Sequence, residues 1–284
     1  ERGWAKLTCK KDTGSWKIES FLMSEREVLR ISKPLFTDIT ESSGLSTVPL
    51  YSRLEALRRG GYAISVGDLN GDGLSDIYVG GWGDSKVYSN NGDGTFLDIT
   101  DATGLSTYKG HAVDRVKAAA ISDLDNDGDQ DIVLSRFIDD ASEDVLVYKN
   151  DGSGQFTAVQ DAIKKIGQFD RAMPMTIADF INDGYNDLYV GFPGARDFTY
   201  LDASPNSLQT NGLFMNNGDA TFTDVSDSFG LNQTNTQAYP HASVKADFNG
   251  DGNIDLLIAD DRRGTSQIYE NTGNAFKIVD AEKS

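Results

Sequence analysis

An acidic stretch of nine residues occurs four times: DLNGDGLSD at 68–76, DLDNDGDQD at 123–131, DFINDGYND at 179–187 and DFNGDGNID at 247–255. The first residues of successive stretches are 55, 56 and 68 positions apart. Each stretch follows the pattern D-x-[DN]-x-D-G-x-x-D, except that Ile181 occupies the third position of the third one. Repetition at such a period indicates an array of similar structural units.

The sequence around each stretch repeats as well and predicts four short strands per unit. Small and apolar residues precede each stretch, an apolar run follows it, and two more strands are separated by turns such as Asn-Gly or Asp-Gly. The last strand of each unit begins at an aromatic residue, namely Phe96, Phe156, Phe222 or Phe276. Repeated four-stranded units predict an all-β fold, a β-propeller whose blades pack both faces against their neighbours.

The number of blades follows from the length of the chain. Residues 41–284 contain the four clear repeats, and residues 1–40 are expected to add a degenerate N-terminal blade without an acidic stretch. Its expected strands lie around Leu7–Cys9, Trp16–Phe21, Val28–Ile31 and Phe36–Ile39. We favour five blades in a single domain, with a shorter ring or a fragment of a longer propeller as alternatives. The insertion at 192–212 is expected to form an exposed loop.

The acidic stretches have the pattern of loops that bind a hard cation. Carboxylates or amides at positions 1, 3 and 5 point inward, glycine at position 6 permits a sharp turn, and position 7 offers its carbonyl. With a bidentate aspartate at position 9, the loop supplies about the 6–8 oxygen ligands that Ca²⁺ prefers. Mg²⁺ usually retains water molecules and takes fewer carboxylates, so the pattern favours calcium.

The EF-hand is the main competing interpretation, and the sequence excludes it. An EF-hand loop requires an acidic ligand at position 12 and a helix on each side. Position 12 is apolar in all four stretches and lies in a strand-like run: Val79, Leu134, Val190 and Ile258. The expected site is therefore a loop between two strands.

With the hairpins NGDGTF (91–96) and NGDATF (217–222), these loops resemble the FG-GAP/VCBS-type repeats of integrin α-chain propellers and of many secreted bacterial proteins. The resemblance covers residues 35–280. It implies a calcium-bearing propeller, usually extracellular, that serves in adhesion or ligand binding. Such propellers often have seven blades, so this shorter chain departs from the family pattern.

The resemblance also implies which residues are calcium ligands. Residues are carried over by their loop position, with the residue at position 7 contributing its carbonyl oxygen. The implied ligands are Asp68, Asn70, Asp72, Leu74 and Asp76 in loop 1; Asp123, Asp125, Asp127, Asp129 and Asp131 in loop 2; Asp179, Asp183, Tyr185 and Asp187 in loop 3; and Asp247, Asn249, Asp251, Asn253 and Asp255 in loop 4. We expect three to four Ca²⁺ ions, with the weakest site in loop 3, where Ile181 offers no ligand.

We expect the calcium to be structural, because clustered carboxylates repel one another when no cation is bound. Replacement of Asp76 or Asp131 by alanine is accordingly expected to lower the melting temperature in calcium and to have little effect in a chelator.

The composition excludes several classes of protein. The chain has 26 Lys and Arg against 44 Asp and Glu, a net charge of −18, which argues against binding to nucleic acid or to anionic lipid. No apolar run approaches the length of a membrane-spanning helix. The start of the sequence has no signal-peptide pattern, so we expect a mature chain located outside the cell, on its surface or in the periplasm. The single cysteine, Cys9, cannot form an intrachain disulfide.

Three functions remain after these exclusions. The first is a non-catalytic binding or adhesion module that recognises a glycan or a protein through the mouth of the propeller. The second is a structural subunit of an extracellular filament or surface layer, suggested by a net charge of +3 on residues 1–34 against −21 on the rest. The third and remotest is a polysaccharide-active enzyme. No catalytic motif is found, so we expect a non-enzyme.

Overall fold

The computed structural model describes residues 2–12, 15–27, 36–45, 63–81, 83–105, 107–108, 111–112, 116–136, 145–163, 173–192, 211–231, 240–260 and 266–279. The chain divides into two compact units, Glu1–Thr40 and Glu41–Ser284. The fold and every acidic loop discussed below belong to the second unit.

The first unit contains one antiparallel hairpin formed by β1 (Arg2–Asp12) and β2 (Ser15–Glu27). The predicted strands at Leu7–Cys9 and Trp16–Phe21 lie within these two strands. The predicted strand at Phe36–Ile39 is wrong, because those residues form a bend and irregular backbone. In each four-stranded sheet of the second unit, the last strand hydrogen-bonds to the third strand. No described strand pairs with residues 36–39. The fifth blade, the single domain and the strand at Val28–Ile31, which lies outside the described residues, stay predictions.

The second unit contains four antiparallel four-stranded sheets, which we call blades 1 to 4. Their strands follow one another in chain order. Blade 1 contains β3 (Ala63–Gly67), β4 (Asp76–Gly81), β5 (Gly83–Asn90) and β6 (Phe96–Asp98). Blade 2 contains β9 (Val116–Ser122), β10 (Asp131–Arg136), β11 (Val145–Asn150) and β12 (Phe156–Ala158).

Blade 3 contains β13 (Met173–Ala178), β14 (Asp187–Gly191), β15 (Gly212–Asn216) and β16 (Phe222–Asp224). Blade 4 contains β17 (Pro240–Ala246), β18 (Asp255–Asp260), β19 (Gln267–Asn271) and β20 (Phe276–Val279). A short helix, α2 (Thr100–Thr103), and a small hairpin, β7 (Thr107–Tyr108) with β8 (His111–Ala112), follow blade 1.

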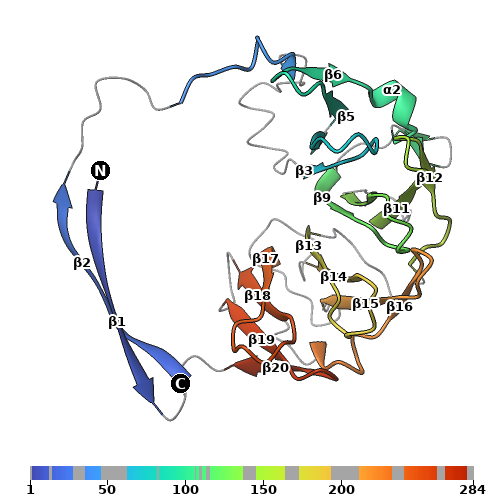
Figure 1. The fold of residues 1–284 in the computed structure, drawn as a ribbon. Coiled ribbons are helices and arrows are strands. Elements are labelled where there is room, and N and C mark those ends of the chain that lie inside the picture. Colours follow the sequence, from blue (N-terminus) through green and yellow to red (C-terminus); the bar gives the residue numbers. More distant parts are fainter. Residues whose placement is uncertain are drawn as a thin grey trace, which may run out of the picture. The chain divides into compact units, whose positions relative to one another are not determined.

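The first strands of successive blades are neighbours, since β3 contacts β9, β9 contacts β13 and β13 contacts β17. Figure 1 shows these four strands on the inner side of the blades, with β6, β12, β16 and β20 on the outer side. The order of strands and the repetition confirm the predicted all-β propeller architecture. The predicted exposed loop at 192–212 lies mostly outside the described residues.

The hydrophobic core is shared between adjacent blades. Every residue of β10 is buried, and its side chains alternate between the two neighbouring blades. Ile132 and Leu134 belong to the cluster between blades 1 and 2, whereas Val133 belongs to the cluster between blades 2 and 3. A second strand buried on both faces explains the continuous apolar runs that follow each acidic stretch.

Candidate metal-binding loops

Each acidic stretch is the loop between the first and the second strand of its blade, so its ends are held by a strand ladder. In blade 2, for example, Ser122 pairs with Asp131 at the base of the loop. The loop backbone takes a left-handed conformation twice. Glycine at position 6 has φ between 82° and 97° in the four loops. Position 4 also has positive φ, and it is always glycine or asparagine, the residues that tolerate this conformation best.

The aspartate at position 1 organises the backbone of the loop. In loop 1 the Asp68 carboxylate accepts hydrogen bonds from the N–H groups of Gly71, Asp72 and Gly73 at 2.8–3.2 Å. In loop 2 the Gly128 N–H donates to Asp123 Oδ2 at 3.0 Å. The same bond joins position 6 to position 1 in loops 3 and 4. A carboxylate that accepts these bonds curls the loop backbone around itself.

The aspartate at position 9 is buried at the base of each loop. Asp131 Oδ2 accepts from the Leu124 N–H at 2.9 Å, and Asp131 Oδ1 accepts from the Asn150 N–H on the third strand at 2.9 Å. Asp76, Asp187 and Asp255 make the same pair of bonds in their own blades. The position-9 side chain therefore connects the start of the loop to the third strand.

Burial raises the pKa of two of these carboxyl groups to about 6, well above the ordinary value of 3.8. They are Asp131 and Asp187, and in both cases desolvation is the largest cause and outweighs the lowering by backbone hydrogen bonds. Desolvation raises the pKa of Asp76 as well. A nearby cation would lower these pKa values and favour the ionised form.

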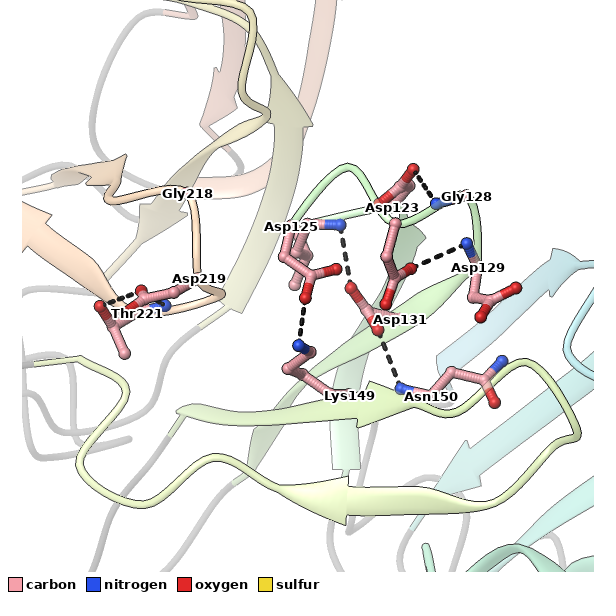
Figure 2. A network of polar contacts seen from close by, with 12 residues as sticks. Asp123, Asp125, Gly128, Asp129, Asp131, Lys149, Asn150, Gly218, Asp219 and Thr221 are labelled. Atoms are coloured by element: carbon pink, nitrogen blue, oxygen red, sulfur yellow. Dashed lines mark hydrogen bonds and ion pairs between the residues drawn. The ribbon is translucent and has the colours of Figure 1, made fainter.

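Loop 2 brings three carboxylates into one cluster. Asp123, Asp125 and Asp131 each place an oxygen within 4.8 Å of the others. Figure 2 shows these side chains converging above β11, with the Lys149 side chain reaching from that strand to Asp125. Among the described residues, the buried atoms Asp123 Oδ1 and Asp125 Oδ1 have no hydrogen-bond partner.

These unpartnered oxygens make loop 2 a suitable calcium site. A buried carboxylate oxygen without a donor is costly, and a hard divalent cation is the ligand that satisfies several such oxygens together. Asp123, Asp125, Asp127 and Asp131 would hold Ca²⁺, which would supply positive charge and cross-link the loop. The Asp129 N–H donates to Asp127 Oδ1 at 3.0 Å, which keeps position 5 inside the turn.

The other loops share the turn but differ at position 3. In loop 1, Asn70 Oδ1 accepts from the Asp72 N–H, and in loop 4, Asn249 Oδ1 accepts from the Asp251 N–H. In loop 3, Ile181 contributes only its backbone N–H, which donates to Asp187 Oδ2 at 3.1 Å. Position 7 in all three loops donates its N–H to position 5, as at Leu74, Tyr185 and Asn253. The full ligand set and the weakness of loop 3 stay predictions.

The sequence pattern did not indicate that the asparagine at the end of the third strand binds the loops. The Asn150 amide donates to Gln130 O in its own loop at 3.1 Å and to Leu69 O in the loop of blade 1 at 2.9 Å. Asn216 and Asn271 bond in the same way to their own loops and to the loop of the preceding blade. Asparagine at this position in all four repeats was the available signal, but the hairpin turn alone accounted for it.

The family comparison agrees with the repeats. The family model for the FG-GAP-like repeat matches residues 68–134 and 123–190, so this part of the chain carries FG-GAP-like repeats. The matched segments contain loops 1, 2 and 3 with the strands that follow them. The resemblance inferred from the loops is therefore confirmed.

The chain is similar to two kinds of curated protein, cartilage acidic protein 1 and integrin alpha-4. Cartilage acidic protein 1 is 28% identical over 210 residues in Xenopus tropicalis and 26% identical over 201 residues in Homo sapiens. These matches cover 70% of this chain but only 29% and 28% of those proteins. Integrin alpha-4 of Xenopus laevis is 27% identical over 146 residues, covering 46% of this chain and 14% of that protein. The chain thus spans less than a third of the relatives it matches.

Solved structures show similarity at lower levels of identity. An Agrocybe aegerita lectin that recognises non-reducing terminal N-acetylglucosamine has a TM-score of 0.46 at 22% identity, covering 76% of this chain and 50% of the lectin. Rhamnogalacturonan lyase YesW has a TM-score of 0.39 at 17% identity, covering 75% of this chain and 42% of the lyase. Within the described residues, no helix has the length and hydrophobicity needed to cross a membrane.

Proposed function

We propose that this chain is a calcium-binding propeller module of an extracellular or cell-surface protein, and that it binds a glycan or a protein without catalysis. The observation that carries the calcium assignment is the pair of buried, unpartnered oxygens Asp123 Oδ1 and Asp125 Oδ1, which lie in a loop built like three others. The extracellular placement and the binding role are supported by the likeness to cartilage acidic protein 1 and integrin alpha-4.

The proposed role of calcium is to stabilise the module on which the partner binds. The loops link the first and second strands of each blade, and their position-9 aspartates also hold the third strand. An ion bound at ten times its Kd stabilises the folded state by about 1.4 kcal/mol, so several ions together contribute on the scale of the whole free energy of unfolding. Millimolar extracellular calcium suits loops of moderate affinity.

Calcium binding is tested by equilibrium dialysis and by thermal melting of the protein as produced, in millimolar Ca²⁺ and in chelator. We expect three to four ions per chain and a higher melting temperature in Ca²⁺. A melting temperature that does not change with Ca²⁺, together with no bound ion, would refute the calcium assignment.

The binding role is tested separately from the calcium. Light scattering on a sizing column in Ca²⁺ should give a monomer of 30.9 kDa, after which retention on immobilised glycans and matrix proteins identifies the partner. A calcium-dependent polymer would instead support the alternative of a filament or surface-layer subunit. Turnover of a polysaccharide, abolished by substitution of an acidic residue outside the loops, would support an enzyme.

A further inference from the structure

In blades 1 and 2, the residue that precedes the asparagine at the end of the third strand contacts position 3 of the acidic loop. In blade 1, Asn70 Nδ2 donates to Ser89 Oγ at 2.9 Å, and in blade 2 the Lys149 ammonium pairs with Asp125. The strand register makes these positions equivalent, because Ser89 and Lys149 each pair with the second residue of the fourth strand. The corresponding residues in blades 3 and 4 are Met215 and Glu270.

In blade 2 this residue has the charge opposite to that of its loop. Loop 2 has aspartate at all four of the side-chain ligand positions 1, 3, 5 and 9, whereas loops 1, 3 and 4 have aspartate at three of them. The loop with the additional carboxylate is the one faced by a lysine. The equivalent residue is the apolar Met215 in blade 3, where position 3 is Ile181, and Glu270 in blade 4, where position 3 is Asn249. Lys149 therefore compensates the negative charge added by Asp125.

The Lys149 ammonium lies against the carboxylate cluster of loop 2 and has the opposite charge. The Asp125 side chain is only 10% exposed, and its Oδ2 contacts Lys149 while its Oδ1 has no partner among the described residues. The Lys149 side chain is 37% exposed, so its ammonium has a path to solvent along the flexible stem. The same Asp125 oxygens are thus within reach of one fixed monovalent cation and of a diffusing divalent one.

We propose that Lys149 is a built-in competitor of calcium at loop 2, neutralising Asp125 when calcium is absent and moving into solvent when an ion binds. The inference rests on the proposed calcium binding. Because the ammonium occupies Asp125 Oδ2 and its charge repels an incoming cation, loop 2 binds Ca²⁺ more weakly than its four aspartates alone would. In exchange, loop 2 keeps the charge of Asp125 neutralised at low calcium, when the loops hold no cation.

The first test measures calcium affinity by titration calorimetry in Lys149→Ser and Lys149→Met, which carry the residues found in blades 1 and 3. We expect one site to bind Ca²⁺ more tightly by on the order of tenfold, because a competing charge has been removed from a partly buried position. Lys86→Ser is the matched control. Lys86 also lies on a third strand and pairs with an aspartate, Asp98, at 2.8 Å, but neither residue belongs to an acidic loop. It should leave every affinity unchanged.

The second test follows the lysine itself by amine labelling and mass spectrometry of the unaltered protein. Lys149 should be labelled slowly in chelator and faster in Ca²⁺, whereas the labelling rate of Lys86 should not respond to Ca²⁺. In Asp125→Asn, which carries the residue found in loops 1 and 4, labelling of Lys149 should become fast in chelator as well. The comparison of Lys149 labelling in Ca²⁺ and in chelator uses the unaltered protein, so it does not depend on whether a substitution changes the stability.

The outcomes separate this inference from the proposed function. If the unaltered protein binds Ca²⁺ but the affinity of Lys149→Ser is unchanged, or Lys149 is labelled equally in both conditions, the competition is refuted and calcium binding stands. If the unaltered protein binds no Ca²⁺ by calorimetry, both are refuted together.

Discussion

The aspartates of the loops hold the backbone as well as offering ligands. Asp68 accepts hydrogen bonds from three backbone N–H groups. Asp131 accepts hydrogen bonds from the N–H groups of Leu124 and Asn150 at the base of loop 2. The loop pattern in the sequence indicated these side chains only as calcium ligands. Because position 9 accepts two backbone N–H groups of the protein itself, we expect it to contribute to stability in calcium and in chelator alike.

Asp131→Ala is expected to lower the melting temperature in both conditions, which revises the expectation drawn from the sequence. The substitution leaves two buried N–H donors without an acceptor, a loss of about 2–4 kcal/mol. The control is Asp127→Ala, because Asp127 accepts one exposed N–H, from Asp129, and its loss should matter mainly in calcium. An unchanged melting temperature of Asp131→Ala in chelator would contradict the structural role.

The raised pKa values predict how stability without calcium depends on pH. Asp131 and Asp187 have a pKa of about 6 in the folded state against an ordinary 3.8, so the folded protein binds protons more tightly than the unfolded chain. Their ionisation therefore removes stability as pH rises from about 4 through 6, and in chelator the melting temperature should rise when the pH is lowered from about 7.5 to 5. A continuous fall over this range, measured by calorimetry at constant ionic strength, would contradict the prediction.

At the scale of the elements, successive blades are joined by the asparagine at the end of each third strand. The side chains of Asn150, Asn216 and Asn271 each reach the position-2 carbonyl of the preceding loop. Leu69, Leu124 and Phe180 at these positions are fully buried, so each carbonyl has exchanged water for an amide donor. Loop and hairpin therefore hold the blades together at the same end at which calcium is proposed to bind.

Asn216→Ala is expected to destabilise the protein by about 1–3 kcal/mol, because the buried carbonyl oxygen of Leu124 and the part-buried one of Asn186 lose their donor. The adjacent Asn217→Ala serves as the control. Asn217 is exposed, and its amide bonds to Thr221 Oγ1 within the same turn. Urea unfolding of both variants measures the difference, and equal free energies of unfolding would show that the contact between blades contributes nothing.

At the scale of the whole molecule, net charge makes the calcium-free protein sensitive to salt. The formal charge is −18, and four bound ions would change it to −10. In chelator, added NaCl should raise the melting temperature because it screens repulsion between the carboxylates, whereas in Ca²⁺ the effect of salt should be smaller. MgCl₂ at equal ionic strength is the control for screening by divalent ions. Equal salt dependence in Ca²⁺ and in chelator would contradict this.

The last blade shows how far the array of repeats determines the fold. Position 2 of the loop is fully buried in blades 1 to 3, at Leu69, Leu124 and Phe180. In blade 4 the same position is Phe248, whose side chain is 49% exposed. The repeats predicted the four described blades, and the acidic stretches join the first and second strands of each as expected, with strand ends that agree to within a few residues. The strand predicted at Phe36–Ile39 is the exception, because the strand pattern is present there but the residues form a bend and irregular backbone.

The sequence by itself determined the turn of the four loops, because the hydrogen bonds from position 1 that curl the backbone lie within nine residues. Alternate carboxylates, glycine at position 6 and glycine or asparagine at position 4 are sufficient to curl the backbone around its own side chains. Only the tertiary structure decided what faces the loops. Lys149 meets Asp125 from another strand, and Asn216 bonds to Leu124 from 92 residues away. Such pairings depend on how strands and blades pack, and short-range patterns carry no information about that packing.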